Sequence, residues 1–280
     1  MEKKAKLGRG LDEVSHFYLS AAKKEEPDAG TPPRVNRNIV SVHHSGSDAI
    51  QSFFLSNLAL ELAKYQFPIY ILDFCDNQDM NIKSKMKRLI KSQGSSSRYS
   101  VTLYGLPSIQ VVEVNPYEDD SIEDILSTAN INGDTCFVFL NTQNSLKINS
   151  NRNTASEFIV LTKTDKISLL QSYAYIKFIL EKSEKNKIYL ILDEIDEEQE
   201  ATRIYRRFAE YVERKLSHTI NYLGGLTHDE YLSRSIEEGK PLVLSQEKSI
   251  TKEKVLLISK NFFTLSNFLE LSKDNSNSRH

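Results

Sequence analysis

The 280-residue sequence contains only two cysteines, no long apolar segment and no excess of either charge. Cys75 and Cys136 lie in or beside apolar runs, and neither has the CxxC or Cys/His spacing of a zinc site. We therefore expect buried free thiols in a reducing compartment and no metal site.

Apolar runs stay well short of the ~18 residues that a membrane-spanning helix needs. The basic start of the chain, residues 1–10, is not followed by the apolar stretch of a signal peptide. These absences predict a cytoplasmic protein that is at most peripheral to the inner membrane.

Neither acidic nor basic residues dominate, because 36 lysines and arginines stand against 38 aspartates and glutamates. This balance gives no broad positive field, which argues against nucleic acid as the main partner. Apolar residues make up 39% of the chain, enough to bury one large core, so we expect one α/β domain rather than two small ones.

The first 38 residues divide into a peptide and a linker. Leu11, Val14, Phe17 and Tyr18 fall on one side of a helix, so residues 1–20 are predicted to contain a docking helix, either for the protein's own domain or for a partner's groove. Residues 21–38 are polar and contain prolines, which predicts a flexible linker. At the other end, residues 273–280 are expected to be a disordered tail.

A βαβ pattern over residues 39–74 organises the rest of the chain. An apolar run and a small, polar turn precede a helical pattern that places Leu55, Leu58, Ala59 and Leu62 on one face, and a second apolar run ends at Asp73. Two parallel strands joined by a helix give this pattern.

Strands and helices continue to alternate beyond this unit. Apolar runs predict strands at 109–114, 136–140, 157–162 and 187–192, with helices at 121–129, 167–180 and 197–216. The domain, residues 39–272, is therefore predicted to be an α/β fold with a mainly parallel, twisted sheet and helices on both faces. We expect the serine-rich stretch 92–100 to be a surface loop, and the apolar arc of residues 251–272 to pack against the sheet rather than bind a membrane.

Three groups of ionisable residues have structural explanations. His43 and His44 could be metal ligands, but neighbours in a strand point to opposite faces, so we expect a structural pair at a strand end. The acidic run 193–198 suits a solvated helix start, with a cation site or a basic partner as the alternative. The arginines of the following helix, between residues 203 and 214, are expected on a solvated face, with anionic lipid or an acidic partner as the alternative.

Several short motifs follow one another along the chain in a characteristic order. They are Asn57-Leu58-Ala59 in the first helix, a second strand ending in Asp73, Tyr173-Ala174, Leu223-Gly224, and Gly239-Lys240-Pro241-Leu242. In this order they resemble the MinD/ParA family of deviant P-loop ATPases, most of all the branch of MinD and the flagellar-number regulators, over roughly residues 39–271. The resemblance implies a P-loop NTPase fold, a site for ATP and Mg²⁺, and dimerisation.

The resemblance assigns a nucleotide loop that lacks most of the family's chemistry. Aligned on Asn57, the family's K-G-G-x-G-K-[ST] motif falls on residues 46–52. There Gly46 replaces the signature lysine, Gln51 replaces the Walker lysine, and only the hydroxyl of Ser52 remains. Each charge-assisted hydrogen bond to a phosphate is worth about 1.5–3 kcal/mol, so both replacements weaken nucleotide binding.

The magnesium side is altered in the same way. Asn141 stands where the family has an aspartate, although Asp73 or Asp76 could still supply a carboxylate. We therefore predict a pseudo-ATPase without a bound cofactor. Its vestigial nucleotide-binding residues are Gly46, Gln51, Ser52, Asp73, Asp76 and Asn141.

The resemblance also implies a role as a non-catalytic scaffold or regulator in bacterial spatial organisation. Such a protein would contact an active MinD/ParA-like relative, a second copy of itself, or a partner that binds the peptide of Leu11, Val14, Phe17 and Tyr18. Two alternatives remain open: a weak or partner-completed ATPase that uses ATP and Mg²⁺, and a membrane-associated adaptor.

Overall fold

A computed structural model of the chain describes residues 36–74, 80–93, 98–103, 106–115, 120–131, 135–142 and 155–266. The proposed docking peptide and most of the linker lie outside these ranges, as do Cys75, Asp76 and the C-terminal tail. Cys136 is a buried free thiol as predicted, and burial raises its pKa to about 11. None of the described helices is both long enough and apolar enough to span a membrane.

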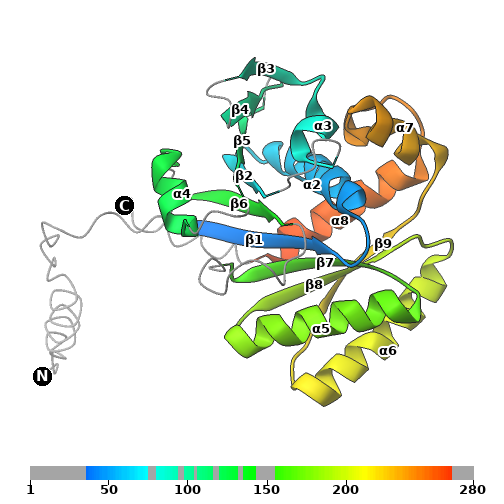
Figure 1. Ribbon diagram of the computed structural model, residues 1–280. Coiled ribbons are helices and arrows are strands. Elements are labelled where there is room, and N and C mark those ends of the chain that lie inside the picture. Colours follow the sequence, from blue (N-terminus) through cyan, green and yellow to red (C-terminus); the bar gives the residue numbers. More distant parts are fainter. Residues whose placement is uncertain are drawn as a thin grey trace, which may run out of the picture. The chain divides into compact units, whose positions relative to one another are not determined.

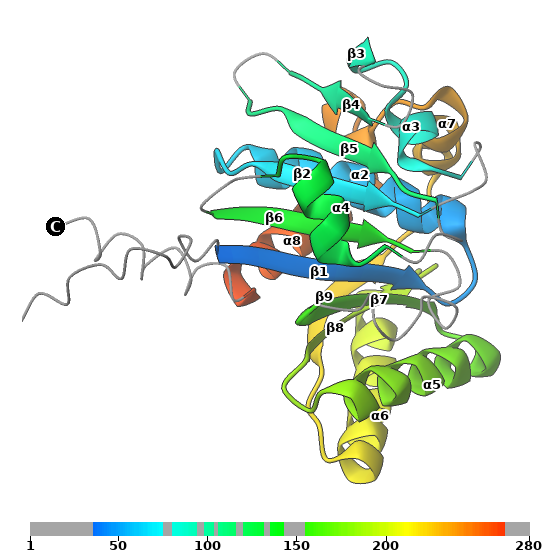
Figure 2. The same ribbon diagram turned by 60° about the vertical axis from the view of Figure 1, so that its left-hand side comes forward.

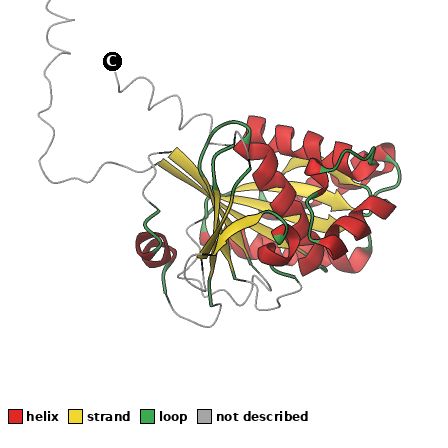
Figure 3. Cartoon of the chain, turned by 90° about the horizontal axis from the view of Figure 1, so that it is seen from above, coloured by secondary structure: helices red, strands yellow, loops and turns green. Residues whose placement is uncertain are grey.

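The described residues form one sheet of nine strands, which runs through the centre of the domain (Figure 1). In spatial order the strands are β3 (Ile90–Gln93), β4 (Arg98–Val101), β5 (Ile109–Glu113), β2 (Ile69–Asp73), β6 (Thr135–Asn141), β1 (Asn36–His44), β7 (Glu157–Lys163), β8 (Lys187–Asp193) and β9 (Asn221–Leu226). Strand β4 pairs antiparallel with β3 and with β5, and all the other neighbouring strands of this described sheet pair in parallel. Seen from above, the strands fan out rather than lying in one plane, which is the twist that the predicted α/β fold requires (Figure 3).

Helices cover both faces of the sheet, and each face has its own apolar core. One face carries α2 (Asp48–Ala63), α3 (Ile82–Met86), α7 (Glu230–Glu238), the 3₁₀ turn η2 (Leu242–Leu244) and α8 (Ile250–Leu265). The other face carries α4 (Ile122–Thr128), α5 (Lys166–Lys182) and α6 (Glu198–Leu216). The mainly parallel α/β architecture predicted from the sequence is therefore confirmed.

Helix α2 is buried on almost every side, because it lies between the sheet, α3 and α8. Its Asn57, part of the Asn-Leu-Ala motif, has a structural role. The Oδ1 atom accepts a hydrogen bond from the Val243 N–H at 2.9 Å, and Nδ2 donates to the carbonyl of Phe53 at 2.8 Å. Asn57 thus ties α2 to η2.

Helix α8 packs against the sheet over its described length, as predicted, and ends at Leu265. Val255, Ile258 and Phe262 are buried, and the Phe262 ring lies 5.3 Å from that of Tyr189 on β8. Phe262 therefore cannot face a lipid surface unless α8 detaches from the sheet.

Two boundaries differ from the sequence prediction. The stretch 92–100 is not a single surface loop, because Ser92 and Gln93 pair with Ser100 and Tyr99 in the hairpin of β3 and β4. Pairing of β4 with β5 outweighs the weak strand preference of serine there. Strand β1 also starts at Asn36, three residues before the predicted domain boundary at 39.

Candidate functional site

The candidate site lies where the carboxyl ends of β1, β2, β6 and β8 meet. Strand β1 is central, with β6 on one side and β7 on the other. The chain leaves β1 through α2 toward β2 on the β6 side and returns later to β7 on the opposite side. Ligands of open α/β sheets bind outside the carboxyl ends of the strands at such a reversal point.

The loop at this point is short. Strand β1 ends at His44 and α2 begins at Asp48, with the Ser47 hydroxyl capping the helix by accepting the Ile50 N–H at 3.3 Å. Of the seven positions aligned with the phosphate-binding motif, residues 46–52, the last five are helical. Little backbone is left that could wrap a phosphate.

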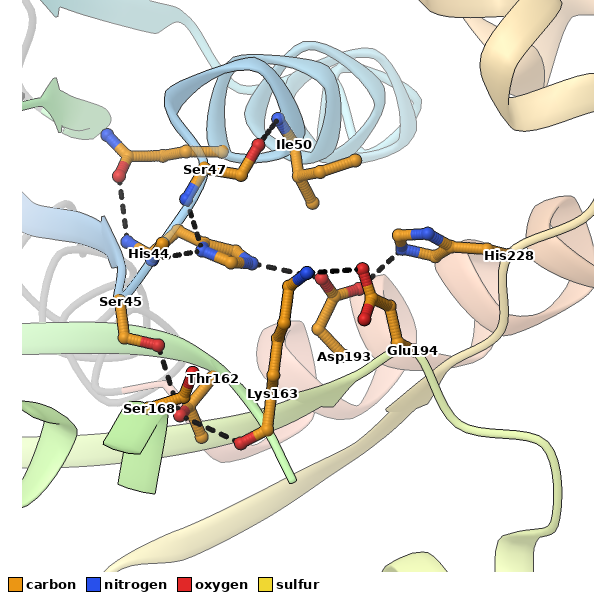
Figure 4. Close-up of polar contacts among 12 residues, drawn as sticks. His44, Ser45, Ser47, Ile50, Thr162, Lys163, Ser168, Asp193, Glu194 and His228 are labelled. Atoms are coloured by element: carbon orange, nitrogen blue, oxygen red, sulfur yellow. Dashed lines mark hydrogen bonds and ion pairs between the residues drawn. The ribbon is translucent and has the colours of Figure 1, made fainter. Parts of the chain in front are cut away.

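The side chain of His44 fills the space inside this loop (Figure 4). The N–H groups of Gly46 and Ser47 both donate to His44 Nδ1, at 2.9 and 2.8 Å. Since Nδ1 accepts two hydrogen bonds, the ring proton sits on Nε2, which donates to Asp193 Oδ2 at 3.0 Å. The two backbone donors that a phosphate would require therefore already bind a side chain of the same protein.

Asp193 is the buried centre of a histidine–carboxylate–histidine cluster. His228 Nε2 lies 2.7 Å from Asp193 Oδ1, opposite His44, and the His228 side chain remains 28% exposed. Burial by itself would raise the pKa of Asp193, but the hydrogen bonds from His228 and His44 outweigh it and lower the pKa to about 2. Burial opposes protonation of His228, yet its bond to Asp193 and the charge of that carboxylate raise its pKa.

These interactions correct one prediction and confirm another. Asp193, expected in a solvated acidic run, is fully buried because two histidines pair with it, whereas Glu194 and Asp196 are exposed. His43 and His44 form a structural pair, as predicted. The His43 ring lies 4.2 Å from Tyr175, and its pKa is lowered to about 4, first by burial and then by its electrostatic interaction with the neighbouring imidazole of His44.

The two residues that the sequence resemblance aligns with a lysine and an aspartate bind each other. Gln51 Oε1 accepts the His44 backbone N–H at 2.8 Å, and Gln51 Nε2 donates to Asn141 Oδ1 at 2.7 Å and to the Thr142 carbonyl at 3.2 Å. Asn141 Nδ2 in turn donates to Ser52 Oγ at 3.0 Å and to Asp73 Oδ1 at 2.8 Å.

The outer members of this network are bonded as well. Asp73 Oδ2 accepts the Ile82 N–H at 2.8 Å, and the Ser52 hydroxyl donates to the carbonyl of Met80. Hydrogen bonds thus link four of the six residues predicted from the sequence, Gln51, Ser52, Asp73 and Asn141. Gly46 is bonded to His44 in the adjoining loop, and Asp76 lies outside the described residues. Their assignment as nucleotide ligands stays a prediction.

The replacements suit one another chemically. A glutamine has both a donor and an acceptor, so Gln51 links the His44 N–H to Asn141, which a lysine without an acceptor could not do. An aspartate at position 141 would place a second carboxylate against Asp73, and the amide avoids that repulsion.

Sequence reasoning missed the roles of His44, Asp193 and His228 in closing the loop. A usable signal was present, because His44 and Asp193 end parallel strands and His228 follows β9 by two residues. The carboxyl ends of parallel strands share one edge of a sheet, so polar residues at those positions are candidates for contact.

No family model matches the sequence, and no curated protein matches it. Solved structures do match. One is the MinC:MinD cell division protein complex of Aquifex aeolicus, with TM-score 0.57 and 14% identity over 82% of this chain and 96% of that chain. Another is a ParA family ATPase of Chlorobium tepidum, with TM-score 0.55 and 14% identity over 80% and 98%. The chain has the MinD/ParA fold. A third match, MinD of Pyrococcus horikoshii in complex with Mg-ADP, has TM-score 0.57 and 11% identity over 82% and 97%.

Several groups at this edge of the fold are already paired within the described residues. The N–H groups of Gly46 and Ser47 are bonded to His44, and the lysine drawn at this edge in Figure 4, Lys163, pairs with Glu194 at 2.6 Å. Within the described ranges, no group of three or more histidine, cysteine, aspartate or glutamate side chains could hold a metal ion.

Proposed function

We propose that this protein is a non-catalytic scaffold or regulator in bacterial spatial organisation, which acts through contacts with other proteins and does not hydrolyse ATP. One observation carries the proposal. The groups that would have to bind a nucleotide are already hydrogen-bonded to side chains of the same protein. They extend from the Gly46 N–H to the Asp73 carboxylate.

The energetic argument compares what a nucleotide gains with what the loop gives up. A phosphate entering the loop has to displace the His44 ring from the N–H groups of Gly46 and Ser47, and it meets Gln51 where a lysine would neutralise it. The absence of two charge-assisted hydrogen bonds removes about 3–6 kcal/mol. Micromolar affinity corresponds to about −8 kcal/mol, so little binding energy remains.

A protein partner follows from the same reasoning. If the loop no longer switches with nucleotide, the remaining function of the fold is to present surfaces. The solved MinC:MinD complex illustrates a protein of this fold bound to another protein. We propose an active MinD/ParA-like relative, a second copy of the chain or another protein as the partner, with a cytoplasmic location.

Titration of the full chain with Mg-ATP, followed by calorimetry and by thermal unfolding, tests the proposal. We expect no saturable heat and no rise of the melting temperature up to about 1 mM nucleotide. A MinD protein that binds Mg-ADP serves as the positive control. Saturable stabilisation below that concentration would contradict the proposal.

One observation favours the alternative of a partner-completed ATPase. The Ser52 hydroxyl and the Asp73 carboxylate are both bonded to Asn141, so two groups suited to a magnesium shell remain close together. In that case, nucleotide binding would appear only after a partner that supplies a lysine is added to the same titration.

A further inference from the structure

Helix α5 exposes two large aliphatic side chains on its first turns. Ile167 is 69% exposed and Leu170 is 53% exposed, although both belong to residue types that are usually buried. They are three residues apart, so they lie on one side of the helix. Neighbouring apolar side chains left in water in this way are typical of a contact surface.

The apolar surface continues onto α6. Helices α5 and α6 lie side by side in both Figure 1 and Figure 2 and contact each other. The rings of Tyr173 on α5 and Tyr211 on α6 meet edge to face at 5.1 Å, and Tyr211 is exposed. We use the name α5–α6 ridge for the surface formed by Ile167, Leu170, Tyr173 and Tyr211.

Cations surround the α5–α6 ridge. Arg207 and Arg214 lie one turn before and one turn after Tyr211, and the Arg214 guanidinium lies 5.8 Å from the centre of the Tyr211 ring. Lys166 precedes Ile167 at the start of α5. All three are exposed and form no ion pair within the part of the chain that the structure describes. Asp165, Glu210 and Glu213 are also exposed and are neighbours of these cations in sequence, but Arg207 and Arg214 share the side of α6 that carries Tyr211.

We propose that the α5–α6 ridge is the docking site for an acidic amphipathic helix of a partner protein. Ile167 and Leu170 would take the apolar side of that helix, and Lys166, Arg207 and Arg214 would pair with aspartates and glutamates along its flanks. The inference rests on the proposed scaffold function and deepens it, because it specifies the surface and the chemistry of the partner.

The charges decide between this partner and other occupants. A second copy that docked through the same ridge would bring like charges of Lys166, Arg207 and Arg214 together, which disfavours a symmetric dimer. Nucleic acid needs cations for its phosphates but gains little from exposed aliphatic side chains such as Ile167 and Leu170. An acidic helix with an apolar stripe matches both features.

The test selects binders from a displayed library of random peptides as long as α5, 17 residues, with the full chain as bait. We expect enriched peptides to carry apolar residues at helical spacing flanked by Asp and Glu. Their affinity should fall at least about tenfold for the variant Ile167→Ser/Leu170→Ser. The matched control Ile250→Ser/Leu257→Ser, which changes two exposed residues of α8, should bind as the unaltered protein does.

A charge variant separates the two parts of the proposal. Arg207→Glu/Arg214→Glu should abolish the preference for acidic peptides, and higher salt should weaken binding of the unaltered protein. All variants change exposed side chains, and equal thermal unfolding temperatures check that they are folded.

Four outcomes would overturn the proposal. The first is that peptides are enriched no more by the unaltered protein than by the Ile167→Ser/Leu170→Ser variant, and the second is enrichment of peptides without acidic residues. The third is that this variant loses binding to phosphatidylglycerol vesicles or duplex DNA instead of binding to peptides. The fourth is that it loses a dimer that the unaltered protein forms in sedimentation equilibrium. None of them involves nucleotide, so a failure here is distinguishable from a failure of the proposed function.

Discussion

Replacing Gln51 and Asn141 by the family's lysine and aspartate tests whether these two residues depend on each other. Their side chains are each 1% exposed, and Gln51 Nε2 donates to Asn141 Oδ1 at 2.7 Å. If the two substitutions compensate, the double variant should be more stable than the sum of the single variants predicts.

Asn141→Asp alone is expected to lower the free energy of unfolding by about 3–5 kcal/mol at pH 7. The change removes the hydrogen bonds that Asn141 Nδ2 donates to Ser52 and Asp73, and it places a second carboxylate beside Asp73. One of the two carboxyl groups then keeps a proton in the folded state, so its folded pKa is raised above the unfolded value. The loss of stability should therefore shrink below about pH 4 and grow as the pH rises.

Gln51→Lys alone is expected to cost about 2–4 kcal/mol, because the His44 N–H loses its acceptor and an ammonium group is buried. In the variant Gln51→Lys/Asn141→Asp, the new ammonium faces the new carboxylate. We expect this pairing to recover about 1–3 kcal/mol relative to the sum of the single losses.

Urea unfolding followed by far-ultraviolet circular dichroism measures all four corners of this cycle. A parallel cycle that combines Asn141→Asp with Ile250→Ser, an exposed change on α8, should be additive. Additivity within about 0.5 kcal/mol for Gln51 and Asn141 as well would refute the view that they form one unit.

Three further substitutions probe the loop and the motif of α2. His44→Ala should lower stability by about 2–4 kcal/mol and speed hydrogen exchange at the Gly46 amide, measured by NMR, because the imidazole no longer accepts that N–H. His228→Gln should destabilise most at low pH. The pKa of His228 is raised in the folded state, so its contribution to the free energy of unfolding is fully present below about pH 6.5 and is lost as the pH rises through the folded pKa. Urea unfolding at several pH values measures this dependence. Asn57→Ala should cost about 1–3 kcal/mol in the same assay, because the buried Val243 N–H loses its acceptor.

Much of the fold follows from the sequence because the strongly periodic segments decide it. The parallel strands are continuous apolar runs, since both faces of the sheet are covered by helices, and such runs are recognisable without homologues. The hairpin of β3 and β4 was missed because its stability comes from pairing with β5 across a gap in sequence rather than from local preference.

The candidate site was predicted in part. The alignment of short motifs identified Gln51, Ser52, Asp73 and Asn141, and the structure brings these four side chains together. From the sequence, each departure from the motif counts as a separate loss of nucleotide-binding energy. The hydrogen bonds among them depend on side-chain geometry, which spacing along the chain does not reveal. For the same reason, the burial of Asp193 between two histidines was not foreseen.

Under the proposed function, the hydrogen bonds within the loop predict that neither Gln51→Lys nor Asn141→Asp alone gives nucleotide binding. A lysine at position 51 removes the acceptor of the His44 N–H, and an aspartate at position 141 opposes Asp73. Neither change moves the His44 ring from the N–H groups of Gly46 and Ser47, because Asp193 still holds its Nε2. Each substitution alone is therefore expected to cost stability and to leave the N–H groups of Gly46 and Ser47 bonded to His44. We therefore expect nucleotide binding only in a variant in which the loop, position 51 and position 141 are changed together.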